Sequence, residues 1–468
     1  MVRLMRWFGI VLAGLLISSL YAQPLERGPI YAGQELDYQP SIMRLGNSNQ
    51  LVIVFERLNP TNLSGDLLLS SSNDNGATWS TPQPIIATNS NERHPALVQH
   101  GAQAYSLFYL SNATGGFRIH RATSSDGLTW AAQGPLELGW ASTGEINPTV
   151  IVADGKLTMT YQRLGSPSTI HIAQSSDNGA TWDTQRTQIA QGQLPRLAWR
   201  AEDNQYVVAY QTGNTMLKMY SKTSSDVYSW GNQAHPLSID ANSHDAMPLV
   251  LEDGTFFVSY VKANDANGFD VMYRTSSDGQ TWSPEVAVTN EHAGDVEPHG
   301  LLTEQAGRLL LAWGRPVSSS DYNIWLERDL VIPADLSNAQ LSVDQTNFDP
   351  GTELNYTLQF TNTGLAPNTG QLTITLPTVC CPDLAGQNAS HGTLSYDSQT
   401  HQYMWSYILP VGEPISINLR LKVADLGMAP GTVLTTSAII QTNDQRWPLS
   451  VSSIANGEQR IYLPFVGH

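Results

Sequence analysis

A short Ser-Asp-Gly-Thr-Trp signature occurs five times between residues 72 and 282, at intervals of about fifty residues. Its clearest copies, residues 72–79 and 175–182, both match S-x-D-x-G-x-T-W. The three looser copies span residues 124–130, 224–230 and 276–282. A period of about fifty residues is the length of one four-stranded blade in a β-propeller. The repeat therefore predicts a ring of similar β-sheets.

Each signature is interpreted as a tight hairpin turn. Its Asp side chain can accept hydrogen bonds from backbone N–H groups ahead of it, its Gly permits a positive φ, and its Trp can pack back between strands. Residues 74–76, Asp-Asn-Gly, also resemble the start of a calcium-binding loop. No Glu follows at the twelfth position to complete such a loop, so we expect a structural turn.

Six prolines mark the start of the first strand in six repeats. They are Pro40, Pro95, Pro148, Pro195, Pro248 and Pro298. Each precedes an apolar segment, a turn and a strongly β segment, such as residues 51–55. The sixth repeat has no signature and no fourth strand before Pro333, which would leave a sheet edge exposed. We predict that residues 28–34 supply this strand and close a six-bladed propeller.

The fifty-residue period stops near Leu336, where short alternating runs rich in Thr, Asn, Leu and Val begin. This change predicts a second all-β domain over residues 334–460, followed by a tail at residues 461–468. The segment resembles the immunoglobulin-like β-sandwich repeated in bacterial surface proteins. That resemblance implies a spacer or an adhesive stalk.

Charge and the N-terminus limit the expected partners and location. The chain has 24 Lys and Arg against 41 Asp and Glu, a net charge of −17, which repels nucleic acid and anionic membrane surfaces. Residues 1–22 are typical of a secretory signal peptide, because Arg3 and Arg6 precede an apolar run too short to span a bilayer. With cleavage after Ala22, we expect a secreted or cell-surface monomer that is not inserted in a membrane.

The only two cysteines, Cys380 and Cys381, are adjacent. A framework of several disulfides is therefore excluded. A strained vicinal disulfide, free thiols and intermolecular bonds all stay open.

Four repeats place a carboxylate before the first strand and a cation after the second. The pairs are Asp37 with Arg57, Glu145 with Arg163, Asp245 with Lys262, and Glu297 with Arg315. Antiparallel pairing would bring both members of each pair to the same end of a blade, where loops converge on the axis. These pairs are either cross-strand ion pairs of small net stability or a site in which guanidinium groups hold a polar ligand.

The hairpin signatures resemble the Asp boxes of the sialidase superfamily, and residues 38–45 with 55–57 are similar to the first blade of that family. The family places an Arg in a [Phe/Tyr]-Arg-Ile-Pro motif there, followed by an acid/base residue. Tyr38 stands at the position of that Arg, and Arg93 precedes His94 and Pro95 one blade later. The resemblance implies that Asp66 is the general acid/base and that Glu145 activates a nucleophile or water.

The expected function is recognition of a glycan by a secreted propeller, acting as an exo-glycoside hydrolase on an acidic glycan. The alternative is a non-catalytic surface or adhesion propeller. Classical sialidase activity is disfavoured, because loss of the motif Arg removes a contact worth about 1.5–3 kcal/mol. Besides Asp66 and Glu145 as catalysts, the candidate substrate-binding residues are Arg57, Arg93, Arg163, Arg315, Tyr38, Glu297 and Asp245.

Three histidines, His94, His244 and His299, also fall near the starts of blades. They belong to the second, fifth and sixth repeats, so a pocket-lining role is favoured over a shared metal ion. We expect no metal and no cofactor.

Overall fold

A computed structural model describes residues 27–46, 48–240, 242–264, 268–291, 293–318, 320–424, 428–442 and 445–456. These residues form 35 strands in two groups of sheets. None of their segments is a helix long and apolar enough to span a bilayer. The predicted signal peptide, residues 1–22, and the predicted tail, residues 461–468, lie outside the described residues.

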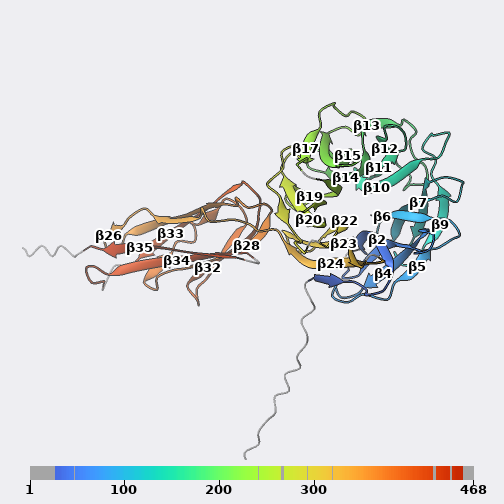
Figure 1. Cartoon of the computed structure of the whole chain (residues 1–468). Helices are drawn as coiled ribbons and strands as arrows, with labels where there is room; N and C mark the ends of the chain where they lie inside the picture. The colour runs from blue at the N-terminus through green and yellow to red at the C-terminus, as the bar shows by residue number, and fades with distance from the viewer. Residues whose placement is uncertain are drawn as a thin grey trace, which may run out of the picture.

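The first group of sheets is a ring of six four-stranded antiparallel blades (Figure 1). From the innermost strand outward, the blades are β2 (Leu36–Arg44), β3 (Leu51–Leu58), β4 (Gly65–Ser72) and β5 (Gln83–Ile86); β6 (Glu92–Gly101), β7 (Ala104–Ser111), β8 (Arg118–Ser124) and β9 (Ala131–Pro135); β10 (Glu145–Ala153), β11 (Lys156–Arg163), β12 (Thr169–Ser175) and β13 (Thr187–Gln191); β14 (Gln193–Arg200), β15 (Gln205–Thr212), β16 (Lys218–Ser224) and β17 (His235–Ser238); β18 (Ser243–Val250), β19 (Phe256–Ala263), β20 (Phe269–Ser276) and β21 (Val286–Ala287); and β22 (Val296–Leu302), β23 (Arg308–Ser318), β24 (Asp321–Val331) and β1 (Arg27–Pro29). Each innermost strand contacts the innermost strands of both neighbouring blades, in the cyclic order β2, β6, β10, β14, β18, β22 and back to β2. The predicted six-bladed propeller is confirmed.

The N-terminal strand β1 closes the ring as predicted, although it spans Arg27–Pro29 rather than residues 28–34. It pairs antiparallel with β24, with Arg27 opposite Glu327 and Pro29 opposite Trp325. One parallel pair, Leu36 with Tyr322, then joins the sheets of blades six and one. The outer edge of β24 is therefore covered by a segment that lies about three hundred residues earlier in the chain.

The Asp boxes are hairpin turns between the third and fourth strands of five blades. In the first box, Asp74 accepts the Thr78 N–H at 2.8 Å and the Thr78 hydroxyl at 2.6 Å. Ser72 Oγ accepts the Gly76 N–H at 2.8 Å, and Gly76 has a φ of +91°. Trp79 donates to the Gly76 carbonyl at 3.1 Å and packs against the core between blades one and six. The box is structural, as interpreted from the sequence.

Every innermost strand contains a β-bulge at the same place, where its register with the second strand skips. One residue in each bulge is left-handed although it is not glycine, with φ between +46° and +59°. These residues are Gln39, His94, Asn147, Leu194, Asp245 and Glu297. A proline follows the bulge residue in five blades, but Ala246 follows it in the fifth. The use of Pro248 as the fifth marker was therefore wrong by two residues, because the ladder register rather than the proline sets the bulge.

The second group of sheets forms a β-sandwich over the C-terminal part of the described chain (Figure 1). One sheet contains β25 (Gln340–Val343), β27 (Glu353–Thr361), β33 (Pro414–Val423), β29 (Cys380–Pro382) and β30 (Asn388–Ala389), and the other contains β26 (Asn347–Phe348), β35 (Arg446–Ala455), β34 (Val433–Gln441), β28 (Asn368–Thr375), β32 (Gln402–Leu409) and β31 (Thr393–Asp397). Buried and exposed residues alternate along β27, β33 and β34, so each sheet turns one face to the shared core. Its immunoglobulin-like character stays a prediction.

The two cysteines lie at the edge of the sandwich in strand β29. Both are free thiols, with Cys380 buried in the sandwich core and Cys381 exposed. Burial raises the pKa of Cys380 to about 11, so this thiol is protonated and inert at neutral pH.

A loop of the sandwich docks onto the propeller. Leu365 and Ala366 join the apolar cluster that contains Leu309 and Trp313 of blade six. At the junction, the Asp335 N–H donates to Asn362 Oδ1 at 3.1 Å. The two domains are therefore joined by packed side chains as well as by the chain itself.

Candidate functional site

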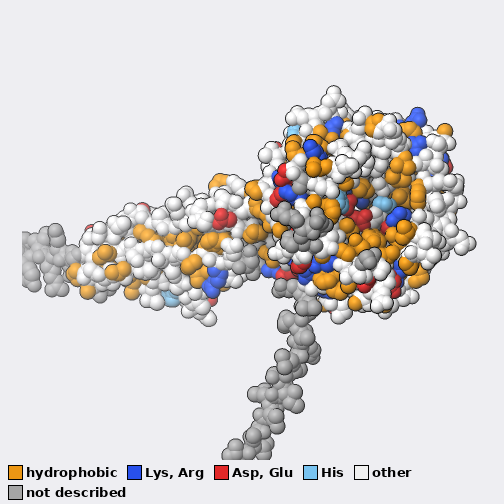
Figure 2. All heavy atoms as spheres, viewed as in Figure 1, with side chains coloured by type: hydrophobic (Ala, Val, Ile, Leu, Met, Phe, Trp, Pro, Cys, Tyr) orange, Lys and Arg blue, Asp and Glu red, His pale blue; other side chains and the backbone are white. Residues whose placement is uncertain are grey.

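The six innermost strands surround a cavity of about 380 Å³ along the propeller axis. Gln39, His94, Asp245 and Glu297, all bulge residues, line it together with two residues from positions after the bulge, Arg196 and His299. Figure 2 shows acidic and histidine side chains gathered at the hub of the ring, where the surface is hollowed. We call these six residues the hub cluster.

Hydrogen bonds link four bulge residues of the hub cluster across neighbouring blades. Gln39 Nε2 donates to Glu297 Oε1 at 2.5 Å and lies 3.0 Å from His94 Nε2. Asp245 Oδ2 accepts the Glu297 backbone N–H at 3.3 Å and lies 2.8 Å from His244 Nδ1. The bulges of blades one, two, five and six therefore place their side chains in one connected group, as left-handed residues at a functional site often do.

Arg196 enters the same cavity from blade four. Its Nη1 donates to Thr149 Oγ1 at 3.4 Å and to the Pro195 carbonyl at 3.2 Å. Among the described residues, no carboxylate lies within ion-pair distance of its guanidinium group. Its charge still acts on Asp245 and Glu297, which lie close enough for a Coulombic interaction. Arg196 is therefore a partly buried cation that can bind an anionic partner in the cavity.

The two carboxyl groups of the hub cluster have opposite protonation preferences. Burial, followed by the negative charges of Asp245 and Glu56, raises the pKa of Glu297 well above its usual value. Burial also opposes ionisation of Asp245, but the imidazole of His244 outweighs it and lowers the pKa of Asp245. Glu297 therefore holds a proton under conditions in which Asp245 is a carboxylate.

The pKa values of the histidines near the cavity are also shifted in opposite directions. Burial alone would lower the pKa of His244, but the carboxylate of Asp245 raises it. Burial and the charge of Arg196 lower the pKa of His299 to about 4 and that of His94 well below its usual value. No group of three or more metal-binding side chains is placed to hold an ion in the part of the chain that the structure describes.

Two of the four predicted cross-strand pairs are present. Arg57 binds Asp37 through two contacts of 2.7 and 2.8 Å, and Arg163 lies 3.8 Å from Glu145. The two remaining pairings are wrong.

In the fifth blade, Lys262 stands opposite Ser243 rather than Asp245, and its ion pairs are with Asp240 and Glu285. In the sixth blade, Arg315 binds Asp295 rather than Glu297, at 2.6 and 2.7 Å. The reason is the bulge, which adds one residue and separates the ion-pairing position from the cavity-lining position.

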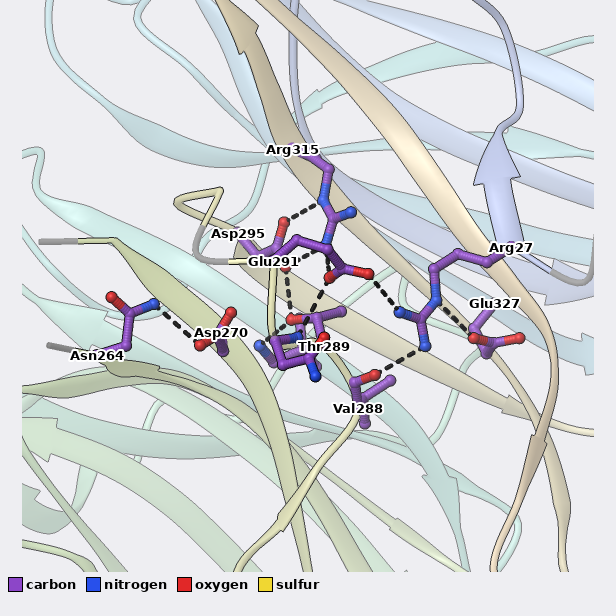
Figure 3. A network of polar contacts seen from close by, with 11 residues as sticks. Arg27, Asn264, Asp270, Val288, Thr289, Glu291, Asp295, Arg315 and Glu327 are labelled. Atoms are coloured by element: carbon purple, nitrogen blue, oxygen red, sulfur yellow. Dashed lines mark hydrogen bonds and ion pairs between the residues drawn. The ribbon is translucent and has the colours of Figure 1, made fainter. Parts of the chain in front are cut away.

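Arg315 belongs to a network that fastens the ring closure rather than to the cavity (Figure 3). Besides Asp295, it binds Glu291 at 3.0 Å. Glu291 also contacts Arg27 of β1 at 3.1 Å, and Arg27 binds Glu327 of β24 at 2.7 Å. These contacts join the closing strand to blades five and six.

The structure does not bring the predicted catalytic pair together in the cavity. Asp66 lies at the start of β4 opposite Arg57, whereas Glu145 lies in blade three beside Arg163. Arg163 is further engaged by the Thr143 carbonyl and by Ser142 Oγ, both at 2.6 Å. None of these residues lines the cavity, and neither does Arg315.

The remaining predicted residues lie in or beside the hub cluster. Asp245 and Glu297 line the cavity. Arg93 binds Glu56 at 3.0 Å, next to the bulge of blade two. Tyr38 packs against Tyr322 with ring centroids 4.5 Å apart and planes tilted by 33°. Burial, Tyr322 and Glu297 raise the pKa of Tyr38 to about 12.

Gln39 and Arg196 were not predicted from the sequence, whereas the pocket-lining role expected of His94 and His299 agrees with their place in the cavity. A signal was present in the spacing. An acidic residue stands three positions before the proline in four repeats: Asp37, Glu92, Glu145 and Asp295. All four are buried; Asp37, Glu145 and Asp295 form ion pairs, whereas Glu92 accepts hydrogen bonds from Thr88 and Ser111. In three of these repeats the residue directly before the proline, which is Gln39, His94 or Glu297, lines the cavity.

Comparisons with known proteins found one family match and several similar solved structures. The BNR repeat-like domain profile matches residues 87–291. A protein of unknown function from Dyadobacter fermentans is 18% identical, covering 65% of this chain and 97% of that chain with a TM-score of 0.52. A Hadza microbial sialidase is 14% identical over 64% of this chain and 67% of its own, with a TM-score of 0.51. An α-L-arabinanase from Penicillium chrysogenum is 17% identical over 62% and 92%, with a TM-score of 0.46.

No curated protein sequence matches the chain. At these identities, the likeness to solved structures concerns the fold. Residues 87–291 therefore match the BNR repeat-like domain, and they lie within a six-bladed propeller whose fold is similar to that of a microbial sialidase.

Proposed function

We propose that the propeller binds a carbohydrate at the hub cluster. The observation that carries this proposal is the convergence of ionisable and amide side chains from five blades on one cavity. Concave sites with a few convergent polar groups are typical of ligand binding. The similarity in fold to a sialidase and the BNR repeat-like match support a glycan as the ligand class.

The ligand that we propose is an acidic glycan. Arg196 has no carboxylate partner within ion-pair distance among the described residues, and a guanidinium group in that state favours a carboxylate or sulfate ligand. We further propose, on the basis of residues 1–22, that the protein is secreted or displayed at the cell surface. Exo-acting glycoside hydrolysis is the activity that fits this ligand.

A non-catalytic adhesion propeller is the second candidate. The specific observation in its favour is that Arg57, Arg163 and Arg315 all have partners within the protein, so they are not free to clamp a substrate. Cross-strand ion pairs of this kind stabilise blades without any role in catalysis.

Binding on a glycan array, followed by calorimetric titration of the best acidic hit, tests the proposal. We expect Arg196→Met to weaken binding by about 10- to 150-fold, the equivalent of a charged hydrogen bond of about 1.5–3 kcal/mol. Lys156→Met, which changes an exposed cation in β11, and Arg163→Ala are the controls and should bind like the wild type. Absence of glycan binding by the folded wild type, or equal binding by Arg196→Met, contradicts the proposal.

A further inference from the structure

We infer that Glu297 and Asp245 are the proton donor and the base of a glycosidic-bond-cleaving site at the hub cluster. This inference rests on the proposed binding of a carbohydrate there. It assigns catalysis to neighbouring bulge residues of blades five and six, and not to Asp66 and Glu145. The two side chains line the same cavity, and the Glu297 N–H donates to the Asp245 carboxylate at 3.3 Å.

The surroundings of Glu297 favour a protonated carboxyl group whose proton has no hydrogen-bond acceptor among the described residues. Its Oε1 accepts a hydrogen bond from Gln39 at 2.5 Å. Its Oε2 is buried, and no hydrogen-bond partner for it occurs among the described residues. An unpartnered buried polar atom costs free energy, so its presence beside a cavity favours a role for a bound ligand. A proton on Oε2 would be available to the glycosidic oxygen of a bound sugar.

The hydrogen bonds of Asp245 favour its ionised form, next to the protonated Glu297. Its Oδ2 accepts from His244 Nδ1 at 2.8 Å and from the Glu297 N–H. His244 is itself fixed by Phe269, with ring centroids 4.6 Å apart and planes at 62°. A carboxylate oriented by an imidazole, next to a neutral carboxyl, is the division of labour that acid/base hydrolysis needs.

The reaction balances with these groups and one water. Glu297 Oε2 gives its proton to the glycosidic oxygen as the bond from that oxygen to the anomeric carbon breaks. Water attacks the anomeric carbon and gives one proton to the Asp245 carboxylate. The products are a reducing sugar and an alcohol, and transfer of the proton from Asp245 to Glu297 restores the starting state.

The charged and polar neighbours of Glu297 determine the pH at which it loses its proton, and so the pH dependence of the proposed activity. They are Tyr38, Gln39 and Glu56 from blade one, Arg196 from blade four, and Asp245 from blade five, with His94 linked through Gln39. Activity should fall at low pH as Asp245 is protonated and at high pH as Glu297 loses its proton. The alkaline fall should be absent in Glu297→Gln.

Substrates with two different leaving groups distinguish the role of Glu297 as proton donor from the role of Asp245 as base. The substrates are methylumbelliferyl and dinitrophenyl glycosides of a panel that includes sialic acid and L-arabinose. We expect Glu297→Gln to lose about 10²- to 10⁴-fold on the methylumbelliferyl substrate but little on the dinitrophenyl substrate, whose leaving group needs no proton. Asp245→Ala should lose activity on both, and azide should restore it, because azide attacks without a base.

Asp66→Asn and Glu145→Gln are the matched controls and should keep wild-type turnover. The inference is overturned if the wild type binds the glycan but cleaves no substrate, if Glu297→Gln loses both substrates equally, or if the controls lose activity while Glu297→Gln does not. Calorimetric binding by the wild type is measured in parallel. Loss of turnover with binding intact overturns only the catalytic assignment, whereas absence of binding overturns the proposed function.

Discussion

Carboxylates two residues apart in the chain have different environments in this propeller. Asp295 is fully buried and holds Arg315 of its own blade. Glu297 faces the cavity and is held by Gln39 of the next blade. A side chain's role here depends on its offset from the bulge, since the bulge turns one residue toward the axis.

At the residue scale, we predict that Glu297→Gln stabilises the protein at neutral pH. The pKa of Glu297 is raised in the folded state, so its contribution to stability is full below its usual value of 4.5 and is lost as pH rises through the raised pKa. Replacing the carboxyl by a neutral amide removes that loss, worth about 1.4 kcal/mol for each pH unit between the two pKa values.

Thermal unfolding followed between about pH 4 and about pH 8 measures this effect. The melting temperatures of wild type and Glu297→Gln should converge at the acid end and diverge as pH rises. Glu304→Gln, at an exposed position, is the control and should follow the wild type throughout. A constant difference at every pH would show that packing, not ionisation, separates the two proteins.

The bulge is the repeated element that builds the site. In five blades a proline comes directly after the left-handed bulge residue. Proline restricts φ and has no N–H group to donate to the ladder, so it is compatible with a bulge. The fifth blade has Ala246 there and keeps the same bulge and the same left-handed conformation at Asp245. The proline is therefore compatible with the bulge but not required for it.

At the element scale, we predict that Ala246→Pro stabilises the propeller by about 0.4–1 kcal/mol. The substitution restricts the unfolded chain, while the folded backbone already has the shape that accepts proline in five other blades. Met247→Pro, one residue later, is the matched comparison and should destabilise, because Met247 is paired with Ser259 in the ladder. Chemical denaturation of the three proteins checks this, and a loss of stability in Ala246→Pro would mean that the fifth bulge differs from the others.

The whole ring depends on strand β1. It is the fourth strand of blade six, and the contacts of Arg27 with Glu327, Glu291 and the Val288 carbonyl fasten it to two blades (Figure 3). Without it, β24 would present an unpaired edge. The stability of the six blades as one unit therefore depends on residues at the beginning of the described chain.

At the scale of the whole molecule, we predict that a chain starting at residue 27 folds as a monomer. A chain starting at residue 32 should fold into a less stable propeller that self-associates. The shorter chain lacks β1, so it should melt at a lower temperature and self-associate through β24. Light scattering coupled to size-exclusion chromatography, with a thermal melt of each chain, measures both effects. Equal melting temperatures and two monomer peaks would refute the role given to β1.

Much of the fold was predictable because its signals are local. The spacing of the Asp boxes gave the blade length, and the missing fourth strand of the sixth repeat pointed to residues 28–34. Cross-strand pairs were predictable only where the acidic residue stands three positions before the proline, as in Asp37 with Arg57. For Asp245 and Glu297 the extra bulge residue was not recognised, although Asp295 has the same offset from its proline as Asp37, so the partners of Asp245 and Glu297 were misassigned.

By itself, the sequence determined a propeller followed by a second all-β domain, since hydrophobic alternation, turn chemistry and repeat length act over short stretches of chain. Only the tertiary structure decided which charges meet. Closing six sheets into a ring brings Gln39, Arg196, Asp245 and Glu297 into one cavity although more than fifty residues separate most of them. Burial and repulsion from Asp245 then keep a proton on Glu297, whereas His244 keeps Asp245 ionised, and the cavity that sets these environments exists only in the assembled ring.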